Sequence, residues 1–197
     1  MVNDLDAGST YVATSDLGTS ANNVVQLDGS AKLPAVDGSQ LTGITDNGKV
    51  LQQVHAATSA VATGTTVFPS DDTVPQNTEG NEAITLAITP SHASNKLIIS
   101  ATIFHSSSAA AGNMGTALFQ DSTAGALSAV LTKYANGGDV MTTSLVYQMA
   151  AGTTSATTFK IRCGSEGAGT WTLNGTGGAR LLGGVASTTL TITEIGA

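Results

Sequence analysis

The chain has 197 residues, of which 11% are charged and 41% are hydrophobic, and its formal net charge is -7. Its seven lysines and arginines form no concentrated basic patch, which excludes nucleic-acid binding and binding to an anionic membrane. The chain has no apolar run of transmembrane length, and its first residues lack the regions of a secretory signal peptide.

Residues 24–44 alternate short aliphatic pieces with two Asp-Gly-Ser units, which begin at Asp28 and Asp37. Asp-Gly favours turns, because glycine adopts positive φ freely and the aspartate side chain bonds back to the backbone. A disordered linker would have a similar content of Gly, Ser and Asp, but the aliphatic spacing favours three chains that wind together and bury these side chains. We therefore expect an intertwined trimeric shaft over residues 21–48, with a core of Val25, Leu27, Leu33, Val36, Leu41 and Ile44.

From residue 49 onward, apolar and polar residues alternate with period two, which is typical of strands. The clearest strands are expected within residues 95–105, 142–150, 157–163 and 188–195, and residues 57–82 are expected to be irregular. Many strands without a convincing helix predict an all-β fold, a C-terminal β-sandwich of jelly-roll type over residues 49–197. Because small residues dominate, we also expect some sandwich faces to pack against neighbouring subunits.

Most residues that could carry chemistry have an ordinary structural interpretation. Cys163 alternates with apolar residues, so we expect a buried core thiol. Residues 43–50 nearly match a phosphate-binding loop, but Val50 stands where Ser or Thr is required. His55, His92 and His105 are not spaced as a ligand pair, although one histidine per chain could bind a metal on a threefold axis. We therefore assign no metal and no cofactor.

Four carboxylates lie within residues 71–82, and a pair of carboxylates can hydrolyse glycosides. A solvated acidic loop explains the same residues, and it is the interpretation we prefer, so we expect no enzyme activity. The four residues are Asp71, Asp72, Glu79 and Glu82.

Glycine-rich and polar loops are the candidates for recognition of a partner, over residues 105–114, 134–139 and 164–178. Trp171 has glycine-rich flanks and could stack on a sugar ring, although a core position on a short strand explains it as well. The candidate receptor-binding residues are His105, Asn113, Tyr134, Asn136, Asp139, Trp171 and Asn174.

The segment NNVVQLDGSAKLPAVDGSQLTGI, residues 22–44, resembles a segment of bacteriophage tail fibres and related virion fibre proteins. Residues 71–103 are similar to the start of a C-terminal fibre domain. The resemblance implies a homotrimeric protein on the surface of a phage particle, whose head binds a host surface glycan or protein. It also implies an N-terminal arm over residues 1–20 that docks on other virion proteins, for which we select Asp4, Leu5, Tyr11 and Leu17.

The shaft expected here is far shorter than that of typical tail fibres, so a head fibre or decoration protein on the capsid is the alternative to a tail fibre. A glycan depolymerase is a third and less favoured interpretation.

Overall fold

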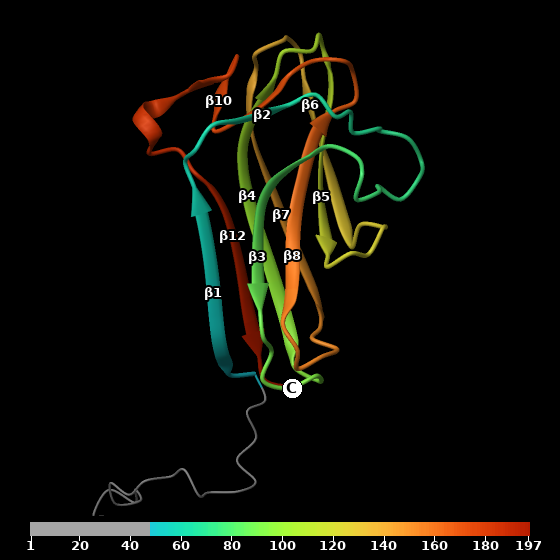
Figure 1. The fold of residues 1–197 in the computed structure, drawn as a ribbon, viewed down its shortest axis with the longest axis vertical. Coiled ribbons are helices and arrows are strands. Elements are labelled where there is room, and N and C mark those ends of the chain that lie inside the picture. Colours follow the sequence, from blue (N-terminus) through green and yellow to red (C-terminus); the bar gives the residue numbers. More distant parts are fainter. Residues whose placement is uncertain (1–47) are drawn as a thin grey trace, which may run out of the picture. The chain divides into compact units, whose positions relative to one another are not determined.

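The computed structural model describes residues 48–197 (Figure 1). The docking arm expected over residues 1–20, and the core residues of the expected shaft, lie outside the described residues. The described part contains strands and one short 3-10 helix, η3 (Leu182–Gly184), but no α-helix. It contains no helix that is long and apolar enough to cross a membrane.

The described residues form two antiparallel sheets that pack face to face (Figure 1). The long strands of the first sheet run in the order β1 (Val50–Thr58), β12 (Thr188–Ile195), β4 (Lys96–Ser107) and β7 (Val140–Ala150). The second sheet has the order β3 (Asn81–Ile88), β8 (Thr157–Ser165), β5 (Gly112–Gln120) and β6 (Ser128–Tyr134). This is the strand order of a jelly roll, so the predicted all-β sandwich is confirmed.

Short strands extend the first sheet at one end. β9 (Trp171–Leu173) pairs with the last residues of β4 and with β2 (Ala62–Gly64). β10 (Gly175–Thr176) and β11 (Ala179–Arg180) pair as a separate hairpin. The expectation of an irregular stretch over residues 57–82 therefore holds for most of its length, but its two ends lie in β1 and β3, and β2 interrupts it.

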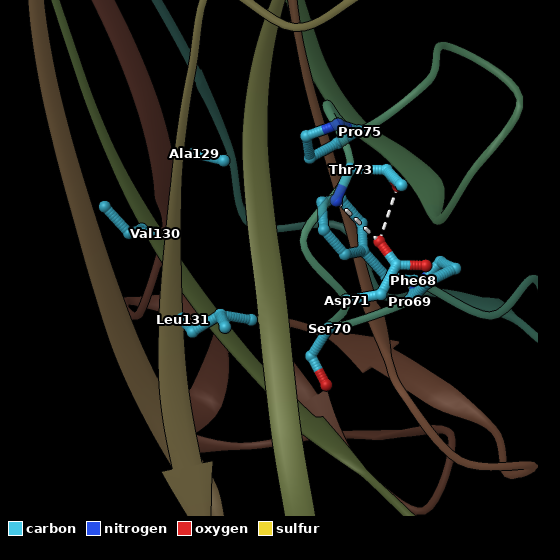
Figure 2. A pocket seen from close by; sticks show the side chains of 9 residues that line it. All are labelled: Phe68, Pro69, Ser70, Asp71, Thr73, Pro75, Ala129, Val130 and Leu131. Carbon is cyan, nitrogen blue, oxygen red and sulfur yellow. Dashed lines mark hydrogen bonds between the residues drawn. The ribbon is translucent and has the colours of Figure 1, made fainter.

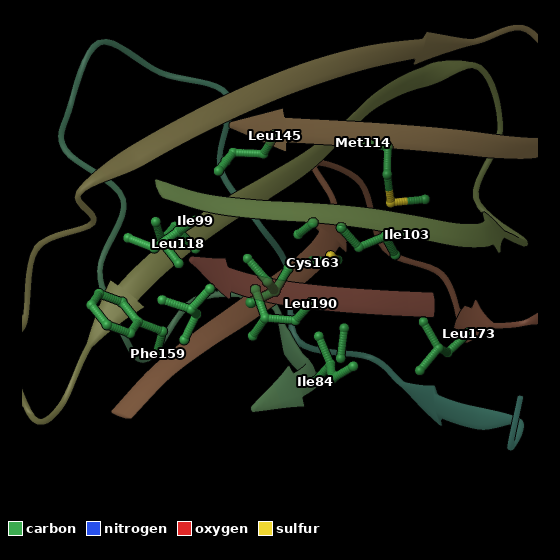
Figure 3. Close-up of a cluster of buried hydrophobic side chains, with 14 of the residues drawn as sticks. Ile84, Ile99, Ile103, Met114, Leu118, Leu145, Phe159, Cys163, Leu173 and Leu190 are labelled. Carbon is green, nitrogen blue, oxygen red and sulfur yellow. The ribbon is translucent and has the colours of Figure 1, made fainter. Parts of the chain in front are cut away.

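The core lies between the two sheets and follows from the period-two patterns (Figure 3). In β4, the buried residues Leu97, Ile99, Ala101 and Ile103 alternate with residues that face outward. Cys163 lies in this core and is fully buried, as expected. Burial raises the pKa of its thiol to about 12, so the side chain behaves as a small apolar residue.

A buried carboxylate closes the end of the sandwich where β1 begins. Glu194 continues the inward-facing row of β12, and no part of the residue is exposed. It accepts hydrogen bonds from Gln52 Nε2 (2.5 Å), Asn95 Nδ2 (2.6 Å), and the backbone N and Oγ of Ser91 (2.8 Å each). Burial opposes ionisation of Glu194, but these hydrogen bonds outweigh it and lower the pKa to about 2. The carboxylate therefore holds β1, β12 and the β3–β4 loop together.

Candidate functional site

The three loops that the sequence marks for recognition meet at one end of the sandwich, opposite the start of β1 (Figure 1). The backbone N–H of Ser108, between β4 and β5, donates to the carbonyl of Thr170, between β8 and β9 (3.0 Å). The N–H of Gly138, between β6 and β7, donates to the carbonyl of Ser107 (2.7 Å). We call this end the distal end. At the distal end, these hydrogen bonds bring loops that are far apart in the sequence together in one surface.

A hollow of about 290 Å³ lies on the outer side of the second sheet, between the segment before β3 and the edge strand β6 (Figure 2). We call it the β6 hollow. A second depression of about 350 Å³ shares part of its lining and continues past Asp72 and Val74. The β6 hollow is lined by Phe68, Pro69, Ser70, Asp71, Thr73, Pro75, Ala129, Val130 and Leu131.

Phe68 forms part of the wall of the β6 hollow, and glycines of the second sheet leave the space that its side chain occupies. The residue is 2% exposed, and its N–H donates to the carbonyl of Ser165 (2.9 Å). A β-carbon on Gly115 would overlap the ring, and one on Gly164 would lie 3.2 Å from the Phe68 β-carbon. The sheet thus lacks side chains where the ring needs space.

Asp71 shapes the mouth of the β6 hollow through a local turn. One of its carboxylate oxygens accepts hydrogen bonds from the N–H (3.0 Å) and the hydroxyl (2.5 Å) of Thr73. These bonds lower the pKa of Asp71. The flanking Pro69 and Pro75 restrict the backbone on either side of the turn. The hollow therefore presents a carboxylate in a fixed position at neutral pH.

A second carboxylate links the β6 hollow to the distal end. Glu166, just after β8, accepts hydrogen bonds from the hydroxyl of Ser70, from Nδ2 of Asn113 (2.9 Å) and from the N–H of Asn113 (3.0 Å). The bonds from Ser70 and Asn113 lower the pKa of Glu166. Asn113 is partly exposed, and its Nδ2 also lies 3.4 Å from the hydroxyl of Ser70, so this sequence-predicted recognition residue lies beside the hollow.

The β6 hollow combines apolar surface with fixed hydrogen-bond acceptors. Leu131 is 55% exposed and supplies an open aliphatic side chain on the β6 side of the hollow, across from Pro69 and Pro75 (Figure 2). Carboxylates and hydroxyls accept hydrogen bonds from ligand hydroxyls, while aliphatic surface packs against the apolar face of a sugar ring. The lowered pKa values of Asp71 and Glu166 keep both groups deprotonated, which makes them poor general acids. The arrangement suits binding better than glycoside hydrolysis.

Of the four carboxylates in the acidic segment, only Asp71 lines the β6 hollow, and Asp72 lines the second depression beside it. Glu79 accepts a hydrogen bond from the N–H of Gln76 (2.9 Å) and stabilises the loop before β3. Glu82 lies exposed on β3, opposite Arg162 of β8. Sequence reasoning grouped the four carboxylates without separating Asp71 from the others, and it missed Phe68 and Leu131. The glycines beneath Phe68 are the signal that could have identified it.

Two further recognition candidates are at the surface of the distal end. Asn136 is exposed in the β6–β7 loop. Asp139 accepts hydrogen bonds from the N–H groups of Ala135 (3.0 Å) and Asn136 (2.8 Å), so it stabilises the turn that presents Asn136.

Four of the candidates selected for receptor contact are buried, and the structure corrects their assignment to the surface. His105, Tyr134, Trp171 and Asn174 are between 0 and 3% exposed. Alternation places His105 on the core side of β4 and Tyr134 on the core side of β6. Trp171 lies on β9, whose three residues are all buried, and Asn174 directly follows β9. For Trp171, the core interpretation weighed in the sequence is the correct one.

Asn174 has a structural role at the end of β9. Its backbone φ is 54°, a left-handed conformation that asparagine tolerates better than most residues. Its Nδ2 donates to the carbonyls of Thr58 and Ala60 (2.9 Å each), and its Oδ1 accepts from the hydroxyl of Thr188 (3.0 Å). The side chain therefore ties β1, β9 and β12 together.

The three histidines do not converge. Nδ1 of His55 lies 2.9 Å from the hydroxyl of Thr191, Nδ1 of His92 lies 2.9 Å from the hydroxyl of Ser94, and His105 is in the core. Among residues 48–197, no group of three His, Cys, Asp or Glu side chains is placed to hold a metal ion.

No protein-family model matches the chain, and no curated protein matches it. Solved structures that resemble it include an Eiger TNF from S. frugiperda (TM-score 0.37, 9% identity, covering 73% of this chain and 92% of that one). A second is infectious bursal disease virus Gx strain (TM-score 0.33, 9% identity, covering 75% of this chain and 41% of that one). A third is the enzymatically active domain of bacteriophage CBA120 tailspike protein 4 (TM-score 0.26, 14% identity, covering 64% of this chain and 19% of that one). The chain thus spans less than half of the two viral chains, and similarity at this level assigns it no function.

Proposed function

We propose that this chain is a trimeric virion fibre protein of a bacteriophage and that its β-sandwich head binds the host cell surface. The sequence support is the segment over residues 22–44, which resembles virion fibres. In this proposal residues 1–20 dock on other virion proteins, residues 21–48 form the intertwined shaft, and residues 49–197 form the head. A tail fibre is the preferred form, and a capsid head fibre or decoration protein is the alternative.

The observation that carries the binding role is the position of the β6 hollow. Through Ser70, Asn113 and Glu166, the hollow adjoins the loops of the distal end, opposite the start of β1. A head attached through β1 would therefore present these loops and the hollow away from its attachment. Weak contacts at three heads on one shaft add up to strong attachment through avidity.

The ligand chemistry that fits the β6 hollow is an uncharged or weakly basic glycan. The acceptors Asp71 and Glu166 are ionised, so an acidic sugar would be repelled. Hydroxyl groups of a neutral sugar would donate to these carboxylates and to Ser70 and Thr73, while Leu131 and the prolines would contact the ring.

The binding test uses the purified full chain on an array of bacterial surface glycans. The Leu131→Glu variant adds charge to the lining of the β6 hollow, and it should lose most of the array signal of the native chain. Val185→Glu is the matched control, because Val185 is 85% exposed and does not line the hollow. Equal loss in both variants, or no glycan signal from the native chain, would contradict glycan recognition by this hollow.

The location test uses gold-labelled antibody against this chain on intact phage particles. Label at the tail supports a tail fibre, and label spread over the capsid supports the head-fibre alternative. Absence of label from purified particles would contradict the virion proposal.

A further inference from the structure

The outer face of the first sheet has no charged residue in its central rows. Its residues alternate with core residues such as Ile99 and Leu190, so they point away from the core. The strand registers arrange them as three rows across β1, β12, β4 and β7. The rows are Gln53, Thr193, Ile98 and Gln148; His55, Thr191, Ser100 and Val146; and Ala57, Thr189, Thr102 and Ser144. We call these residues the threonine face.

The outer side of the second sheet has a different character. Glu82 and Arg162 are paired across β3 and β8, Lys160 lies two residues before Arg162 on the same side, and Lys133 is exposed on β6. The segment that carries Phe68 covers part of this side. The two outer faces of the sandwich thus differ in charge, although both are made of alternating strands.

The chemistry of the threonine face is self-complementary. Hydroxyl and amide groups both donate and accept hydrogen bonds, so two copies of such a surface can satisfy each other. Val146 is 69% exposed at the centre of β7, and Ile98 adds a partly exposed aliphatic group on β4. Depletion of charge with some apolar area is typical of the buried part of a protein interface.

We propose that the threonine face is the surface through which the heads of neighbouring copies of this chain pack together. The net charge of -7 makes two copies repel each other, and contact through an uncharged face brings no like charges together. This inference rests on the proposed trimer, because it names the head surface that the three copies share.

The size of the threonine face indicates how strong this packing is. Four strands about 4.8 Å apart, over about seven residues of about 3.4 Å each, give a surface of roughly 450 Å². A standard interface takes about 800 Å² from each partner. The face alone therefore gives a weak association. β1 is both an edge strand of this sheet and the first described strand, so in the proposed trimer an association of the residues before β1 would bring the first sheets of the copies close together.

The test measures thiol accessibility in the full-length chain, because association of residues before β1 would hide the effect of a variant on oligomeric state. Cys163 is fully buried, so we expect the native chain itself not to react with the thiol reagent. Ala57→Cys and Val146→Cys place single thiols at the two edges of the threonine face, and both positions are exposed in one chain. Leu131→Cys is the matched control, on the edge strand of the other sheet and 55% exposed.

We expect the Val146→Cys or Ala57→Cys thiol, or both, to react with a bulky maleimide about tenfold or more slowly than the Leu131→Cys thiol. The difference should vanish when the sample is diluted or treated to give monomers. If analytical ultracentrifugation shows a trimer and all three thiols react at the same rate, this inference is overturned while the proposed trimer is supported. A native chain that is monomeric at every concentration would overturn both.

Discussion

The indole Nε1 of Trp171 donates a hydrogen bond to Nδ1 of His105 across 3.1 Å, inside the core near the distal end. Indole nitrogen only donates, so Nδ1 carries no proton and the imidazole is neutral. The proton on Nε2 then points to the hydroxyl of Thr143, at 2.9 Å. Burial lowers the pKa of His105 to about 4. The pair therefore holds one tautomer of the histidine and makes the core sensitive to acid.

The first prediction concerns this acid sensitivity. The pKa of His105 is lower in the folded chain than its ordinary value of 6.5, so the unfolded chain binds the proton first. The resulting contribution to the free energy of unfolding is fully present above pH 6.5. It is lost as the pH falls to about 4, and it amounts to roughly 3 kcal/mol. Urea unfolding at a series of pH values, followed by fluorescence of the single tryptophan, measures it.

The matched variant is His105→Gln, because glutamine keeps one acceptor for Trp171 and one donor for Thr143 but does not titrate. Its free energy of unfolding should change less between pH 6.5 and 4 than that of the native chain. A slope equal to the native slope in this range would show that His105 is not the group responsible.

The second prediction concerns Glu194, whose folded pKa of about 2 lies below its ordinary value of 4.5. Its contribution to stability is present above pH 4.5 and is lost as the pH falls through about 2. Glu194→Gln replaces one acceptor oxygen with an NH2 donor, which then faces either the donor of Gln52 or the donors of Ser91 and Asn95. We expect the free energy of unfolding to fall by about 1–3 kcal/mol at neutral pH. We also expect it to depend less on pH between 4.5 and 2 than in the native chain. Glu82→Gln, at an exposed position of β3, should change neither property.

The third prediction concerns the support of the β6 hollow. In Gly115→Ala, the added methyl group overlaps the ring of Phe68, so the ring must move or the sheet must deform. We expect a loss of about 1–3 kcal/mol in the free energy of unfolding, together with weaker glycan binding. In Gly167→Ala the new methyl group would lie 3.9 Å from its nearest neighbour, the β-carbon of Ala109, so this variant should resemble the native chain. Equal effects of the two substitutions would contradict a specific role for Phe68.

The fourth prediction concerns Cys163, which is fully buried and has a pKa of about 12. A thiol reagent should leave the native chain unmodified, because reaction requires an accessible thiolate. Reaction should occur only when the sandwich opens, and its rate should follow unfolding as urea is added. A stoichiometric reaction in native buffer at neutral pH would contradict the buried position.

Period-two alternation was sufficient to predict that the described part is an all-β sandwich. Residues 95–105 read as a strand with Leu97, Ile99 and Ile103 on one side, and these residues are fully buried in β4. The pairing of strands was not predictable from local pattern, because paired strands can be far apart in the sequence. The first described strand, β1, pairs with the last one, β12. Such pairing depends on how the two sheets bury their apolar sides together, which no short window of sequence contains.

The site was harder to predict than the fold. The flanks of Trp171 left both a surface and a core position open, and His105 was selected for receptor contact, but each of the two satisfies its polar atoms inside the core. Glu194 is a charged residue on the buried side of a strand, and only its partners from two other segments explain it. The β6 hollow arises where Phe68 lies over glycines of two distant strands, a contact that spacing alone does not encode.

The antiparallel pairing of β1 with β12 also determines how the head responds to mechanical force. The two strands pair from Val50 and Ile195 at one end to Thr58 and Thr188 at the other. A tensile load that enters at the start of β1 and is resisted at the distal loops acts along β1. This load must shear the hydrogen bonds of the β1–β12 ladder together rather than peel them apart one at a time. The sandwich would then rupture at a higher force under a load along β1 than under a load that peels β1 away from β12.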